Sequence, residues 1–137
     1  MLLIAVLISC SVGPSKIKIG EDACSFCKMS ISDDRFGAEI LTKKGKVYKF
    51  DDLHCVLAFI KAGTVNKDEF KETYIVDFNK PHALIELANI KLLKSIELRS
   101  PMGANIAGFT DQKSLKEAMA TFNGSQMMWV DLLNEKL

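Results

Sequence analysis

Hydrophobic and polar residues alternate along residues 36–40, which predicts a strand with one buried face. A Lys-Gly pair at residues 44–45 supplies a turn, and residues 47–50 offer a second strand. Two short strands that are separated by a tight turn are typical of a β-hairpin. The region is therefore predicted to form one.

A helix is predicted directly after this hairpin. Asp51 or Asp52 can cap its start, the pattern continues through Lys61, and Gly63 is a typical helix stop. After a polar loop, residues 74–78 form the third predicted strand. The first half of the chain thus has the order strand, strand, helix, strand.

The same order of elements returns after Pro81. Residues 82–90 carry no decisive pattern and are interpreted as a connection, and a Pro-Met-Gly turn at residues 101–103 separates the next two strands. The predicted elements are strands at residues 92–98 and 105–109, a helix from Thr110 or Asp111 to about Phe122, and a final strand at residues 127–130.

The two halves share a junction as well as an order of elements. The tripeptides at residues 50–52 and 109–111, Phe-Asp-Asp and Phe-Thr-Asp, each join a strand to a helix, which indicates an internal duplication. We therefore predict an α+β fold, a tandem ββαβ pseudo-repeat packed as one compact domain. Residues 21–80 are expected to form the first half and residues 81–137 the second.

Residues 1–10 have the character of an export signal with a lipidation site. Residues 1–9 are an apolar run much shorter than the roughly 20 residues that a membrane-spanning helix requires. The run ends in Leu-Ile-Ser-Cys, which is similar to the bacterial lipobox, so Cys10 is interpreted as a lipid anchor rather than a metal ligand. Residues 11–20 are rich in Ser, Gly, Pro and Lys and are predicted to be a tether.

Size and charge exclude several classes of function. Without this leader about 125 residues remain, enough for one domain with a modest core. The net charge is +1 and the basic residues are scattered, which argues against a nucleic-acid-binding surface. No Ser/His/Asp or Cys/His arrangement has the local setting of a nucleophile, so no enzyme is predicted.

Sulfur-bearing residues provide the strongest chemical signal. Cys24 and Cys27 form a Cys-x-x-Cys pair that can bring two sulfurs to one ion, and Met29 follows closely. Met102 lies in the Pro-Met-Gly turn, where burial is limited. Thiolate and thioether sulfurs suit Cu(I), so these residues point to metal handling rather than to catalysis.

Structural interpretations exist for several of these side chains. Met29 is as consistent with core packing, the commoner role of Met, as with metal ligation. Cys55 falls on the inward face of the first predicted helix, where a buried structural thiol is favoured over a ligand. His54 and His82 are interpreted as surface residues.

Two other classes of protein fit the same cysteines. One is a structural zinc-binding, treble-clef-like interaction module with Cys24, Cys27 and Cys55 as ligands, completed by His54 or a carboxylate. The other is an adhesion or scaffolding lipoprotein in which Cys24 and Cys27 form a disulfide. Besides Cys10 the chain has three cysteines, and an odd number argues against a purely structural disulfide framework.

Four short motifs occur in one order, at plausible spacing, from around Asp22 to the end of the chain. They are Cys24-x-x-Cys27-x-Met29-x-Ile31, Asp-Arg-Phe-Gly-Ala-Glu-Ile at residues 34–40, Phe50-Asp51-Asp52-x-x-Cys55, and Pro101-Met102-Gly103. With these motifs the chain resembles the NosL family, the membrane-anchored copper chaperones of nitrous oxide reductase maturation. The likeness is fairly specific because several separate motifs agree.

This resemblance implies a tandem ββαβ fold and Cu(I) bound by Cys24 or Cys27 together with Met102. Met29 matches a further family position, so the candidate metal ligands are Cys24, Cys27, Met29 and Met102. The resemblance also implies a periplasm-facing lipoprotein, anchored in the inner or outer membrane through Cys10, that works with an ABC-type copper maturation complex. The expected activity is delivery of copper(I) for assembly of nitrous oxide reductase or a related exported copper enzyme.

Overall fold

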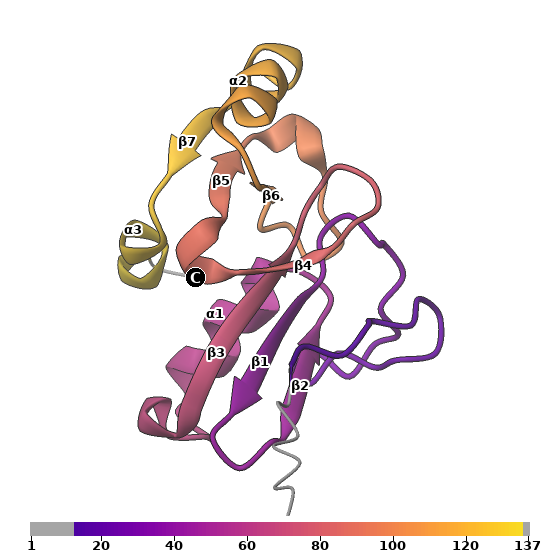
Figure 1. Ribbon diagram of the computed structural model, residues 1–137, viewed down its shortest axis with the longest axis vertical. Helices are drawn as coiled ribbons and strands as arrows, with labels where there is room; N and C mark the ends of the chain where they lie inside the picture. The colour runs from indigo at the N-terminus through magenta and orange to yellow at the C-terminus, as the bar shows by residue number, and fades with distance from the viewer. Residues whose placement is uncertain (1–12, 136–137) are drawn as a thin grey trace, which may run out of the picture.

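Two antiparallel sheets and three α-helices make up the described part of the protein (Figure 1). The computed structural model describes residues 13–135, so the lipidation site expected at Cys10 lies outside the described residues. The first sheet occupies the lower part of Figure 1, and the second sheet lies above it. This mixture of helices and strands confirms the predicted α+β class. No helix in residues 13–135 is both long and apolar enough to cross a bilayer.

The first sheet has the strand order β2-β1-β3-β4, and every neighbouring pair is antiparallel. Its elements are β1 (Ala38–Thr42), β2 (Val47–Phe50), helix α1 (Leu53–Ala62), a 3₁₀ turn (Lys67–Glu69), β3 (Phe70–Val76) and β4 (Leu84–Glu86). Helix α1 follows β2 and lies against one face of the sheet (Figure 1).

The predicted hairpin and first helix are confirmed. β1 pairs with β2, and Gly45 turns the chain between them with a φ of 84°. The side chain of Asp52 caps α1 by accepting a hydrogen bond from the His54 N–H, and Gly63 ends the helix with a φ of 65°. Local turn and capping preferences therefore set the bounds of these elements.

The second sheet repeats this arrangement with the strand order β6-β5-β7. Its elements are β5 (Lys91–Lys94), β6 (Ile106–Phe109), helix α2 (Gln112–Thr121), which Asp111 caps, and β7 (Ser125–Met127). In each sheet the first strand of the repeat lies between the second strand and the strand that follows the helix. The tandem ββαβ prediction is therefore confirmed.

Three strands in the middle of the chain differ from the prediction. The strand expected at residues 74–78 is β3, which begins at Phe70 and ends at Val76. Residues 84–86, expected in a connection, form β4 and pair with β3 at the edge of the first sheet. The strand expected at residues 92–98 ends at Lys94, because Ser95 caps a 3₁₀ turn at Ile96–Leu98. β4 depends on a distant pairing partner, whereas β5 ends early because of a local cap that the alternation of hydrophobic and polar residues does not reveal.

The predicted strand at residues 127–130 is wrong in its second part. β7 ends at Met127, and helix α3 (Trp129–Asn134) follows. Val130 and Leu132 would share one face of a strand, but Leu132 is fully buried whereas Val130 is 58% exposed. Residues 129–134 are therefore helical rather than extended, and the helix buries Leu132 in the core while Val130 faces solvent.

Two hydrophobic clusters form the core of residues 13–135. The larger cluster joins the halves, because residues of β1 and α1 share it with residues of β5, β6 and α3. The smaller cluster lies beneath α2. Phe50 and Phe109, at the equivalent strand-to-helix junctions, are buried in the larger and the smaller cluster respectively. The two halves therefore pack as one compact domain.

Glu39 is buried within β1 and gives the fold a pH dependence. Its Oε1 accepts a hydrogen bond from the Ser15 N–H (3.0 Å), and its Oε2 accepts one from the Ser15 hydroxyl (3.1 Å). Burial raises the pKa of this carboxyl above its ordinary value of 4.5, because the charged form is poorly solvated. The folded state thus holds the proton more tightly than the unfolded chain, and stability falls as pH rises above about 4.5.

Glu39→Gln is expected to remove this contribution. The amide keeps an oxygen for the Ser15 N–H and carries no charge, so the variant should be more stable than wild type at neutral pH. The difference in free energy of unfolding should shrink as pH falls below about 4.5, because wild-type Glu39 is then protonated in both the folded and the unfolded state. Urea unfolding over a pH series measures this, with exposed Glu21→Gln as control. A difference that stays constant with pH would contradict the account.

Candidate metal centre

The Cys-x-x-Cys segment forms a tight loop. The Cys24 N–H donates to the Met29 carbonyl (2.8 Å), and the Lys28 N–H donates to the Cys24 carbonyl (3.0 Å). The Ser25 N–H donates to the Lys49 carbonyl (2.7 Å), and the Lys49 N–H donates to Ser25 Oγ (3.1 Å). The loop is thereby held beside β2, the strand that leads into α1.

Three cysteine sulfurs meet where this loop approaches α1. The Sγ atoms of Cys24, Cys27 and Cys55 lie within 4.8 Å of one another, and we call these residues the thiol cluster. Cys55 lies in the first turn of α1. Cys24 and Cys55 are buried, Cys27 is partly exposed, and all three are free thiols. Because sulfurs bound at about 2.3 Å to one ion stand roughly 4 Å apart, the cluster fits a single soft metal ion.

One negative charge is favoured on the thiol cluster. The pKa of Cys24 is lowered to about 5, mainly because the Cys55 thiol donates a hydrogen bond to its sulfur, helped by the backbone N–H groups of Cys27, Asp51 and Phe26. The pKa of Cys55 is raised, because its thiol is that donor and because it is buried. Burial also raises the pKa of Cys27. The cluster can therefore offer a thiolate at Cys24 to a cation.

The two candidate methionines lie in different surroundings. Met29 is 60% exposed on its loop, so it does not pack in the core. Met102 is partly buried and packs against the hydrophobic cluster that contains the two buried cysteines. Its turn is closed by a hydrogen bond from the Gly103 N–H to the Ser100 carbonyl (3.0 Å). Met102 thus packs on the same hydrophobic cluster as the buried thiols, whereas Met29 faces solvent.

Asp52 connects the first turn of α1 with the turn that carries Met102. Its Oδ1 accepts the capping hydrogen bond from the His54 N–H (2.8 Å). Its Oδ2 accepts from the Ser100 hydroxyl (2.6 Å), the Met102 N–H (2.9 Å) and the Ala104 N–H (3.4 Å). The first turn of α1 therefore contacts both the Met102 turn and, through Cys55, the thiol cluster.

The structure brings together some of the residues expected from sequence and adds others. It places Cys24 beside Cys27, as the Cys-x-x-Cys spacing predicts. Cys55 is buried, as expected, but its sulfur also joins the cluster, which its inward position on the helix could have suggested. Within residues 13–135 no His, Asp or Glu side chain joins these thiols in a group able to share an ion. The His54 or carboxylate ligand of the zinc interpretation is therefore not part of the cluster.

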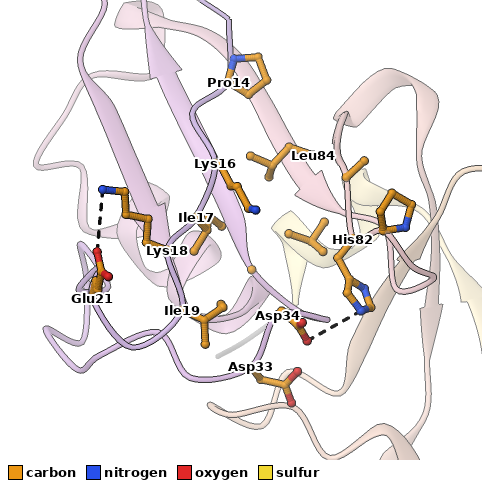
Figure 2. Close-up of a pocket in the computed structure, with 14 residues that line it drawn as sticks. Pro14, Lys16, Ile17, Lys18, Ile19, Glu21, Asp33, Asp34, His82 and Leu84 are labelled. Atoms are coloured by element: carbon orange, nitrogen blue, oxygen red, sulfur yellow. Dashed lines mark ion pairs between the residues drawn. The ribbon is translucent and has the colours of Figure 1, made fainter.

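A groove of about 860 Å³ lies between the N-terminal segment and the loop before β4 (Figure 2). At one end, His82 Nε2 lies 3.8 Å from Asp34 Oδ1, and His82 Nδ1 lies 3.1 Å from the Asp77 carbonyl oxygen. Among residues 13–135, no cysteine or methionine lines the groove. The groove and the thiol cluster are therefore separate features, and His82 lies outside the candidate metal centre.

Comparison with known proteins identifies a solved structure with a similar fold and a matching protein family. The crystal structure of the copper chaperone NosL from Shewanella denitrificans matches with a TM-score of 0.73 at 19% sequence identity, covering 88% of this chain and 95% of that chain. At this identity the likeness establishes the fold. A search of curated proteins finds no match. The NosL family model matches residues 16–137, and the chain therefore belongs to the NosL family.

Proposed function

We propose that the protein is a Cu(I)-binding metallochaperone. The observation that carries this proposal is the thiol cluster, whose three sulfurs lie within 4.8 Å of one another. Soft sulfur donors suit Cu(I), and the hydrogen bonds around Cys24 favour its thiolate. Membership of the NosL family, and the fold shared with a protein named as a copper chaperone, support copper as the metal.

Cys24, Cys27 and Met102 are the proposed copper ligands, and Cys55 is added because its sulfur lies in the same cluster. A thioether at Met102 would favour Cu(I) over harder ions. Met29 is 60% exposed, so its proposed role is to bind copper during entry or exit rather than to hold it.

Exchange of sulfur ligands is the proposed mechanism of transfer. Cys27 and Met29 reach the surface, whereas Cys24 and Cys55 are buried. A sulfur of the acceptor can therefore form a bond to copper from outside while the bond between copper and Cys27 breaks. Copper stays Cu(I) throughout and no electron is transferred. The proposed role is thus binding and transfer, not catalysis.

The proposed site of action is a membrane that faces the periplasm. The Leu-Ile-Ser-Cys sequence supports lipidation of Cys10 and anchoring to the inner or outer membrane. The tether predicted at residues 11–20 is not free along its whole length, because Ser15 bonds Glu39 and Ile17 is buried in the larger core cluster. The proposed partners are an ABC-type copper maturation complex and, as recipient, nitrous oxide reductase or a related exported copper enzyme. The resemblance to the NosL family is what supports these proposed partners.

A structural zinc site is the second candidate, because three thiolates also suit zinc. The two functions differ in what the metal does for the fold. A structural zinc ion contributes to folding directly, so its removal should unfold the protein. A chaperone that loads and unloads copper should stay folded without metal.

Transfer of copper to an acceptor tests the proposed function. Cu(I)-loaded protein is mixed anaerobically with copper-free nitrous oxide reductase, and the copper content of each protein is measured after separation. We expect copper to move to the enzyme and the metal-free donor to keep its circular dichroism spectrum. A Cu(I) chelator complex of matched affinity serves as the control donor. Retention of copper by the donor, or unfolding of the metal-free protein, would contradict the proposal.

A further inference from the structure

Asp52 makes more hydrogen bonds than a helix cap requires. Capping needs one side-chain oxygen that accepts from the helix backbone, and Oδ1 does this for the His54 N–H. Oδ2 instead accepts from the Ser100 hydroxyl and from the N–H groups of Met102 and Ala104. These three donors all belong to the second half of the pseudo-repeat. Asp52 is therefore a connection between the halves.

Burial makes this connection strong. The Asp52 side chain has no exposed surface, and hydrogen bonds to a buried charged acceptor are stronger than those between neutral groups. The N-terminus of α1 also favours a negative charge at this position. The Met102 backbone is consequently fixed relative to the first turn of α1.

The same turn of α1 leads directly to the thiol cluster. Cys55 lies within it, and the N–H of Asp51 donates to the Cys24 sulfur. Direct contacts therefore run from Cys24 through Asp51 and Asp52 to Met102. Any shift of the Met102 backbone against α1 would move the thioether relative to the thiols without altering a thiol.

We propose that Asp52 is the positioning residue of the copper site, because its carboxylate fixes the Met102 turn so that the thioether can join the thiol cluster on one copper ion. This inference rests on the proposed function, since it applies only if these sulfurs bind copper. Asp52 does not ligate the metal; it acts through Met102.

The second half of the chain offers a matched control. Asp111 caps α2 as Asp52 caps α1, with its Oδ1 accepting from the Ser114 N–H (2.8 Å). Its Oδ2 accepts from the Ser114 hydroxyl (2.8 Å), within the same helix. Asp111→Asn therefore alters a helix cap without touching the contact between the halves.

A double-mutant cycle on Cu(I) affinity tests the proposal. Asp52→Asn, Met102→Ala and the double variant are titrated anaerobically against a Cu(I) chelator. Asparagine keeps one oxygen for the cap but turns an NH₂ group toward the donors of the Met102 turn, so we expect affinity to fall by a factor on the order of ten. Met102→Ala should lose a similar factor. The double variant should bind no more weakly than Met102→Ala, because Asp52 acts through Met102.

Cadmium binding provides a readout of the thiols alone. Cadmium(II) is soft and binds thiolates, and its thiolate-to-metal absorption should be the same in Asp52→Asn and wild type. Asp111→Asn should match wild type for both metals. Additive losses of Cu(I) affinity in the double variant, or an equal loss in Asp111→Asn, would overturn the positioning role.

Ser100→Ala covers the case in which Asp52→Asn does not fold. It removes one donor to Asp52 Oδ2 and leaves the helix cap in place, and its loss of Cu(I) affinity should likewise vanish in the Met102→Ala background. A loss that persists there would overturn the proposal. Wild-type protein that fails to bind Cu(I), or binds it independently of Cys24, would instead mark the failure of the proposed function itself.

Discussion

Replacing Cys24 with serine is expected to weaken Cu(I) binding by a factor on the order of a hundred, at about 1.4 kcal/mol per decade. Cys24 carries the favoured thiolate, with its pKa lowered to about 5, and a hydroxyl is a poor ligand for a soft ion. Its sulfur also lies within 4.8 Å of the other two cysteine sulfurs. Anaerobic competition against a Cu(I) chelator measures the affinity of the reduced chain, with Cys10→Ser as the parent.

Met128→Ala is a suitable control for the loss of an accessible sulfur. Met128 and Met29 are both 60% exposed, but Met128 lies at the start of α3. Its replacement should leave Cu(I) affinity unchanged, whereas Cys27→Ser and Cys55→Ser should each weaken binding less than Cys24→Ser. Wild-type affinity in Cys24→Ser would contradict the assignment of the thiol cluster as the copper site.

Phe50→Ala is expected to lower the free energy of unfolding by about 3–5 kcal/mol, the range for removing a buried aromatic ring. Phe50 is fully buried at the end of β2, and its ring packs edge-on against Phe59 of α1 with centroids 5.1 Å apart. The change leaves a cavity in the cluster that joins the two halves. Chemical denaturation followed by circular dichroism measures the loss.

Ile96→Ala serves as the control for this stability prediction. Ile96 is 82% exposed, so its truncation should change the free energy of unfolding by less than about 0.5 kcal/mol. If Phe50→Ala lowers the free energy of unfolding by less than about 1 kcal/mol, the Phe50 ring does not stabilise the core as described.

Elements whose signals lie within a few residues were predictable from sequence. The hairpin depends on the turn at Gly45, and α1 depends on its caps at Asp52 and Gly63. The Cys-x-x-Cys spacing likewise places Cys24 and Cys27 on one loop. Each of these features is decided by local backbone geometry and nearby hydrogen bonds.

Features that depend on distant partners were not predictable in the same way. β4 exists because it pairs with β3, and α3 buries Leu132 in a core shared with the first half. Oδ2 of Asp52 bonds residues that lie 48 to 52 positions away. Periodicity can place Cys55 on the inward face of a helix, but only the packing of the loop on α1 brings its sulfur to the other two.

X-ray absorption at the copper edge of the Cu(I)-loaded, reduced protein tests the central claim most directly. We expect copper to be retained in the presence of a competing chelator and its nearest neighbours to be sulfur atoms, near the roughly 2.3 Å typical of metal–thiolate bonds. Copper that is lost to the chelator, or that is surrounded mainly by nitrogen or oxygen, would contradict this claim.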